Sequence, residues 1–364
     1  MSENIKISLF MLRDFSNVLI ILLLGSLSCI LLSCDTCNSG NNPDNDIRND
    51  IYFSAIPLNG TTGSIFAISQ EGNRLREVLK NAIIYSAPSI DNKIVFQIPG
   101  IDTLLFGTNT SGDTPHQILN QSFKKIVNPI LSPDGKHILV YIGNKQLFLL
   151  TNEIFGQFPT YNFCENTLPS FSPDSKYLAC YEGDNLNSPL TIKITTTTNP
   201  ITTILEKKFN TGINLYNGLA TISWSKDGTY IVYIITDSSG TDVIYGTKLT
   251  GENVFAIKID GIGAATPAVS PDDSSVVYAA RDGNIWQRTI SDNRNFNLTH
   301  DADSSVEYYL YPQFTHDGEN IYFTRFDKTN TKSIFNGTLE IYNLSTKRIT
   351  VLSDNVYRGF QMSK

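Results

Sequence analysis

Residue types that build metal and catalytic centres are scarce in this 364-residue chain, which has five cysteines, four histidines and 17% charged residues. The histidines are scattered without the spacing of metal ligands, at His116, His137, His300 and His316. No Cys-x-x-Cys pair, the usual half of a zinc site, occurs after residue 50. We therefore expect neither a metal site nor a cofactor.

The signatures of several ligand-binding and enzyme classes are also missing. The chain has no phosphate-binding P-loop and no Gly-x-Ser-x-Gly nucleophile elbow. Its formal net charge of −7 argues against nucleic acid as a partner, because nucleic acid selects basic surfaces. These absences favour a non-enzymatic protein, although they leave catalysis by scattered acidic and tyrosine side chains open.

The chain does contain one short sequence motif that occurs five times, each time before an apolar run. It occurs as Ser132-Pro133-Asp134-Gly135, Ser172-Pro173-Asp174-Ser175, Ser225-Lys226-Asp227-Gly228, Ser270-Pro271-Asp272-Asp273 and Thr315-His316-Asp317-Gly318. The five aspartates lie 40, 53, 45 and 45 residues apart. A period of this length with strands in each repeat is typical of a β-propeller.

The residues of this motif are typical of a tight turn. Proline restricts φ, aspartate accepts hydrogen bonds from nearby backbone N–H groups, and glycine tolerates positive φ. We therefore interpret Asp134, Asp174, Asp227, Asp272 and Asp317 as structural residues of tight turns between two strands. The alternative, that they bind a metal or a substrate, is less favoured because a propeller would place them about one blade apart.

Each repeat continues into further strands and predicts a four-stranded antiparallel blade. Five of these repeats begin near residues 129, 169, 222, 267 and 312, and a sixth begins with a shortened copy of the motif near residue 88. Three more strands precede them. We expect the C-terminal strand, residues 357–362, to pair with the N-terminal blade and close a ring of seven blades. Six blades are the alternative. The apolar residues in 75–79 fit the spacing of a helix as well as a strand. We expect a strand, because a complete ring of blades needs one there.

The motif Pro-x-Φ-Ser-Pro-Asp-Gly-Lys, where Φ is apolar, resembles the Pro-Asp variety of WD-like repeat found in TolB-type propellers and in prolyl-oligopeptidase relatives. The match is best at residues 129–140, 169–179 and 267–277. The resemblance implies a propeller over residues 50–364. It does not imply one function, because this repeat serves many roles.

The N-terminus predicts export. Lys6 and Arg13 precede the apolar stretch 18–32, and the following Ser33-Cys34 resembles a bacterial lipobox in which Cys34 receives lipid. We expect a lipoprotein signal peptide at residues 1–33, a disordered polar tether at 34–49 and an anchor on a membrane of the bacterial cell envelope, periplasmic or surface-exposed. A signal anchor, or a cleaved leader without lipid, is the alternative.

The remaining cysteines suit an oxidising compartment. Cys164 and Cys180 flank one expected hairpin, and the sequence leaves open whether they form a disulfide or stay as two buried thiols.

One acidic and aromatic segment is a candidate ligand surface, with Asp301, Asp303, Tyr308 and Tyr309 in a connection between blades. It could bind a cation, a sugar or a peptide, or its aromatic rings could simply pack between blades. The anchor and the missing catalytic residues together predict an envelope scaffold that binds a protein partner. The alternative is a glycan-binding or small-molecule-binding propeller, or one that processes carbohydrates or peptides.

Overall fold

The described part of the chain is built entirely from β-strands and short connections. The structure is a computed structural model that describes residues 50–55, 63–70, 72, 74–98, 105–109, 111–119, 126–142, 146–151, 160–161, 169–183, 189–198, 201–213, 221–300, 302, 305–328 and 336–362. All of these lie in one compact unit, Ile47–Lys364. The predicted all-β propeller class is confirmed, whereas the predicted signal peptide and tether lie outside the described residues.

Five sheets have four antiparallel strands each. The first two sheets contain β4 (Ile83–Ile84), β5 (Lys93–Gln97), β6 (Leu105–Asn109) and β7 (His116–Leu119), then β8 (Ile126–Leu131), β9 (His137–Ile142), β10 (Gln146–Thr151) and β11 (Thr160–Tyr161). The third contains β12 (Ser170–Phe171), β13 (Tyr177–Glu182), β14 (Leu190–Thr196) and β15 (Thr203–Phe209). The last two contain β16 (Ser223–Trp224), β17 (Tyr230–Thr236), β18 (Asp242–Lys248) and β19 (Asn253–Ile259), then β20 (Ala265–Val269), β21 (Ser275–Ala279), β22 (Ile285–Thr289) and β23 (Asn295–Asn297).

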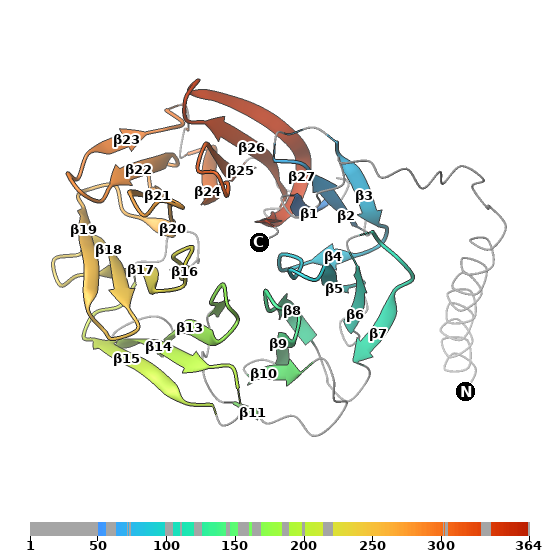
Figure 1. Cartoon of the computed structure of the whole chain (residues 1–364). Coiled ribbons are helices and arrows are strands. Elements are labelled where there is room, and N and C mark those ends of the chain that lie inside the picture. Colours follow the sequence, from blue (N-terminus) through green and yellow to red (C-terminus); the bar gives the residue numbers. More distant parts are fainter. Residues whose placement is uncertain are drawn as a thin grey trace, which may run out of the picture. The chain divides into compact units, whose positions relative to one another are not determined.

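The sixth sheet has seven strands and joins the two ends of the described chain. Its order is β24 (Glu307–Phe314), β25 (Asn320–Asp327), β26 (Asn336–Asn343), β27 (Arg348–Met362), β1 (Ile51–Ala55), β2 (Ser64–Ile68) and β3 (Arg76–Leu79). Residues 76–79 are thus a strand, as the ring favours. The sheets stand around a centre, and in each four-stranded sheet the first strand is innermost and the fourth is at the periphery (Figure 1).

Strand β27 is longer than the C-terminal strand expected at residues 357–362. Its first part pairs with β26 from Arg348 onward, and its last part pairs with β1, where Met362 lies opposite Ile51. Residues 353–355 are Ser-Asp-Asn, a cluster typical of a turn, but they contain no proline or glycine and the strand continues through them. One continuous strand therefore serves two neighbouring groups of strands, and the pairing of C-terminal and N-terminal strands is present. The choice between seven and six blades stays a prediction.

The two ends of the strands form two different faces. The turns from first to second strand and from third to fourth strand lie at one end, because Thr197 N donates to Lys176 O at 2.9 Å and Leu344 N to Glu319 O at 3.0 Å. We call this end the turn face. The other connections lie at the opposite end, the crossover face, where Ala82 N donates to Gly63 O at 2.9 Å.

The core lies between neighbouring sheets. Val232 and Ile244 of one sheet pack with Val276 and Tyr278 of the next, as expected for strands that are buried on both faces. Tyr181 is fully buried, and its hydroxyl accepts a hydrogen bond from Ile234 N of the neighbouring sheet at 3.1 Å. Burial raises the pKa of Tyr181. Apolar packing and some buried hydrogen bonds thus hold the sheets in their relative positions.

The outer strands carry β-bulges near their start. In β15 and β19 the register shift leaves Ile204 and Val254 without a paired residue, and both side chains are exposed. The same irregularity occurs between β6 and β7. A bulge twists an edge strand away from a flat pairing geometry and so hinders edge-to-edge aggregation.

Candidate functional site

The five repeated turns share one set of hydrogen bonds on the turn face. In the first, Ser132 Oγ donates to Asp134 Oδ1 at 2.6 Å, Asp134 Oδ1 accepts from Lys136 N at 3.1 Å, and Ser132 Oγ accepts from His137 N at 2.9 Å. The same bonds recur around Ser172, Ser225, Ser270 and Thr315. Each aspartate is thus engaged within its own turn.

An earlier turn has the same arrangement. Ser89 Oγ donates to Asp91 and accepts from Lys93 N at 3.0 Å. This is the shortened copy of the repeat that begins at Pro88.

Neighbouring turns are also tied to one another. Ile90 N donates to Pro133 O at 2.7 Å, and Asp134 N donates to Ser175 Oγ at 2.9 Å. Further around the ring, Tyr230 Oη donates to Asp273 Oδ1 at 2.7 Å. These bonds join successive sheets at the turn face, so the repeated turns brace the frame of the propeller.

Four of the turn aspartates, Asp134, Asp174, Asp227 and Asp272, have a lowered pKa and are held in their charged form. Burial raises the pKa of Asp134, but the hydrogen bonds from Ser132 and Lys136 N outweigh it, and the pKa lies below its ordinary value. In Asp272 the hydrogen bond from Ser270 is the largest cause, and the pKa is also lowered. A carboxylate that is deprotonated and occupied by local donors suits a structural role better than proton transfer.

The candidate ligand surface is only partly described, because Asp301 and Asp303 lie outside the described residues. Tyr309 is 1% exposed, and its ring meets Phe323 edge-on with centroids 5.1 Å apart. Tyr308 is half-buried, stacks on Phe326 at 5.4 Å and has Lys328 Nζ 5.2 Å from its ring centroid. Tyr309 therefore packs between sheets and is not available to a surface ligand, whereas Tyr308 keeps an accessible edge.

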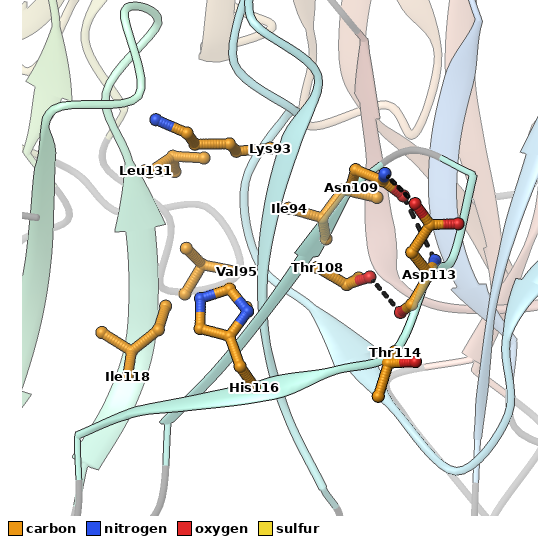
Figure 2. A pocket seen from close by; sticks show the side chains of 11 residues that line it. Lys93, Ile94, Val95, Thr108, Asn109, Asp113, Thr114, His116, Ile118 and Leu131 are labelled. Carbon is orange, nitrogen blue, oxygen red and sulfur yellow. Dashed lines mark hydrogen bonds between the residues drawn. The ribbon is translucent and has the colours of Figure 1, made fainter.

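A pocket of about 260 Å³ opens at the turn face, between β5, β6 and β7 and the end of β8. Asn109 Nδ2 donates to Asp113 Oδ2 and Thr108 Oγ1 to Asp113 O, both at 2.6 Å. This polar group lies at one side of the pocket, and the apolar side chains of Ile118 and Leu131 lie at the other (Figure 2). The arrangement could hold a small molecule with one polar and one apolar end.

Sequence reasoning missed this pocket. Its polar side comes from the turn between β6 and β7, where Asn109 Oδ1 accepts from Asp113 N at 3.2 Å. The stretch 109–113 is rich in Asn, Ser, Gly and Asp, which marks a turn in the sequence. The apolar side combines Ile118 of β7 with Leu131 of the next sheet, so no local pattern could have located it.

The other sequence candidates have mixed outcomes. Cys180 in β13 is disulfide-bonded and 1% exposed, whereas Cys34 and Cys164 lie outside the described residues. Among the described residues, no group of three or more His, Cys, Asp or Glu side chains could hold a metal ion. In the same part of the chain, no helix is long and apolar enough to cross a membrane.

No protein-family model matches the chain, and no curated protein matches it in sequence. Solved structures match it in fold. Puromycin hydrolase bound to PGG is 12% identical with a TM-score of 0.58, and the match covers 84% of this chain and 52% of the hydrolase, so the chain spans about half of that protein. This likeness shows a shared fold alone.

Two TolB structures are also among the matches. TolB from Acinetobacter baumannii is 16% identical with a TM-score of 0.48, and the match covers 86% of this chain and 82% of TolB. A putative TolB from Agrobacterium tumefaciens is 17% identical with a TM-score of 0.47, and the match covers 68% of this chain and 86% of that one. The fold assignment itself rests on the sheets and on the puromycin hydrolase match.

Proposed function

We propose that the chain is a lipid-anchored propeller of the bacterial cell envelope that binds a protein partner through its crossover face and acts as a non-enzymatic scaffold. The observation that carries the proposal is a contrast between the two faces. The first-to-second turns of the turn face are uniform and tie neighbouring sheets together, whereas the connections between sheets on the crossover face differ in length.

The contrast is visible in the lengths of the connections. Five residues join the first and second strands in each of the five repeats, for example residues 172–176 between β12 and β13. At the crossover face, three residues separate β3 from β4 (80–82), and thirteen separate β15 from β16 (210–222). Loops of variable length on a rigid frame are where binding residues concentrate, so the crossover face is the better candidate for partner recognition.

Two further features support an envelope location. The segment ending at Cys34 resembles a lipobox, and Cys180 is disulfide-bonded, a state that persists in oxidising compartments.

Site-specific photocrosslinking in cells tests the proposal. A photoreactive residue at Ser239, which is exposed in the crossover between β17 and β18, should capture one protein in stoichiometric yield. The same residue at Lys176, exposed on the turn face, is the matched control and should not capture it. The adduct should be lost in the Cys34→Ala variant. Capture from Lys176 alone, or from neither position, would count against a protein-binding crossover face.

Small-molecule binding is a second candidate, and the pocket beside β7 is the observation that favours it. A ligand with an apolar body should raise the melting temperature of the propeller. Gly107→Ala should abolish that shift, because its Cβ would lie 2.8 Å from Ile118 Cδ1 and 3.2 Å from His116 Cε1, at the pocket wall. Ser239→Ala, at an exposed position between two strands of another sheet, is the control and should keep the shift.

A further inference from the structure

We propose that the turn face lies against the membrane surface and that its exposed apolar side chains contact lipid. The inference rests on the proposed lipid anchor at Cys34. It assigns the two faces to different partners, with lipid at the turn face and protein at the crossover face.

The place where the chain enters the propeller is the first observation. Asp50 Oδ2 lies 3.0 Å from Arg76 Nη2, which also donates to Tyr52 Oη at 3.0 Å. These contacts fix the start of β1 beside the start of β3, the strand that follows a turn-face connection. Tyr322, just after the last repeated turn, donates to Gln70 O in that same connection. The chain therefore enters the propeller at the turn face.

The segment between Cys34 and the propeller is short, so the point where the chain enters determines which face lies near the bilayer. Fifteen residues, 35–49, separate Cys34 from Asp50. As a polar coil they would span about 20 Å on average, and fully extended at most about 54 Å. An anchor on such a tether holds the entry side of the propeller closer to the bilayer than the opposite side.

Exposed apolar side chains are the second, independent observation. Seven large ones are more than a third exposed among the described residues, and six of them belong to the turn-face connections or to the outer strands that follow them. These six are Leu75, Ile90, Ile204, Val254, Phe296 and Val351. The seventh, Val306, lies in the crossover between β23 and β24. The apolar pocket beside β7 also opens at the turn face.

The charges of the turn face indicate what kind of lipid contact to expect. Lys93, Lys136 and Lys176 are paired with the aspartates of their own turns at 2.7, 4.0 and 3.0 Å. The later turns carry acidic residues without a matching lysine, such as Asp272 and Glu319. Such a surface has no excess positive charge for anionic lipid, so the contact depends on apolar side chains and should be insensitive to salt.

Lysine footprinting of the lipidated full-length protein tests the orientation. The protein is placed on vesicles of phosphatidylethanolamine and phosphatidylglycerol and treated with a water-soluble acetylating reagent. Lys136 and Lys176 of the turn face and Lys80 of the crossover face are matched reporters, because their side chains are 75%, 70% and 79% exposed. The reference is the same protein released from the vesicles by a protease that cuts an inserted site within residues 35–49.

We expect Lys136 and Lys176 to react several-fold more slowly on vesicles than after release, while the rate at Lys80 stays unchanged. Equal rates, or slowing at Lys80, in protein that floats with the vesicles would overturn the orientation and leave the anchor intact. If the wild-type protein does not float with vesicles at all, the proposed lipid anchor at Cys34 is wrong. The proposed orientation is then wrong as well, because it rests on that anchor.

Variants separate apolar contact from simple proximity. Ile90→Asp and Val254→Asp remove apolar contacts from the turn face at exposed positions, and they should restore much of the labelling at Lys136 and Lys176. Val306→Asp, at an exposed position of the crossover face, is the matched control and should leave the protection unchanged. Equal effects of the three variants would contradict lipid contact by the turn face.

Discussion

At the scale of single residues, the repeated motif pairs a serine or threonine hydroxyl with an aspartate two positions later. The hydroxyl is central because it donates to the carboxylate and also accepts from the backbone N–H that begins the next strand. Ser132, Ser172, Ser225 and Thr315 are fully buried, so water cannot replace these bonds. The motif thus solves a local problem, the satisfaction of buried backbone groups at a turn.

Removal of one such hydroxyl should therefore be costly. In Ser225→Ala the N–H of Tyr230, now 3.1 Å from Ser225 Oγ, loses its acceptor. We expect the free energy of unfolding to fall by about 1–3 kcal/mol in urea titrations. Ser239→Ala, which removes an exposed hydroxyl bonded to Asp237 at 2.5 Å, is the control and should cost less than about 0.5 kcal/mol. Similar losses in the two variants would contradict this role.

The turn carboxylates also predict acid sensitivity. The pKa values of Asp134, Asp174, Asp227 and Asp272 lie below the ordinary value of 3.8 in the folded state. Their stabilising contribution is therefore complete above pH 3.8 and is lost as the pH falls through the lowered values. The free energy of unfolding should decrease below about pH 4, with a shallower decrease in Asp272→Asn. An identical pH dependence of both proteins would show that Asp272 does not contribute.

At the scale of strands, close approach between neighbouring strands depends on single small residues. A Cβ at Gly246 of β18 would lie 2.4 Å from the Phe255 ring of β19. That ring also meets Tyr230 edge-on with centroids 6.1 Å apart. The glycine therefore lets an aromatic side chain of the outer strand fold back over the sheet.

Gly246→Ala should destabilise the propeller by about 1–3 kcal/mol, because Phe255 must leave its position. If the cause is this steric contact, the double variant Gly246→Ala/Phe255→Leu should lose less stability than the two single variants added together. Thermal unfolding of the four proteins measures the coupling. Strictly additive losses would point to a cause other than the contact with Phe255.

At the scale of the whole molecule, one strand joins the two ends of the described chain in a single sheet. Residues from Val356 to Met362 of β27 supply the partner of β1, and the side chain of Val356 is fully buried. The pairing covers an edge of β1 that would otherwise expose unpaired backbone groups.

Deletion of residues 356–364 should therefore destabilise the N-terminal strands before the rest of the propeller. We expect faster hydrogen exchange in Ile51–Ala55, which loses one of its two neighbours, while amides of β17 and β18 keep their protection. Deletion of residues 363–364 alone is the control and should leave the exchange of β1 unchanged. Retained protection of β1 in the longer deletion would show that β2 alone holds it.

The sequence by itself determined the elements and the class of fold. The period of the motif, the turn residues within it and the apolar runs after it are local signals, and they predicted the strands around Ile138, Ile231 and Val276 as well as the all-β propeller. The same local chemistry explains why the turn aspartates bond within their own turns.

Only the tertiary structure decided which residues meet across sheets. It packed Tyr309 with Val277 of the neighbouring sheet, made β27 one continuous strand with two partners, brought Leu131 to the pocket of β7, and left six exposed apolar side chains in turn-face connections or in the strands that follow them. These arrangements depend on how different sheets pack and on pairing between strands far apart in the chain, and no local pattern in a single sequence specifies them.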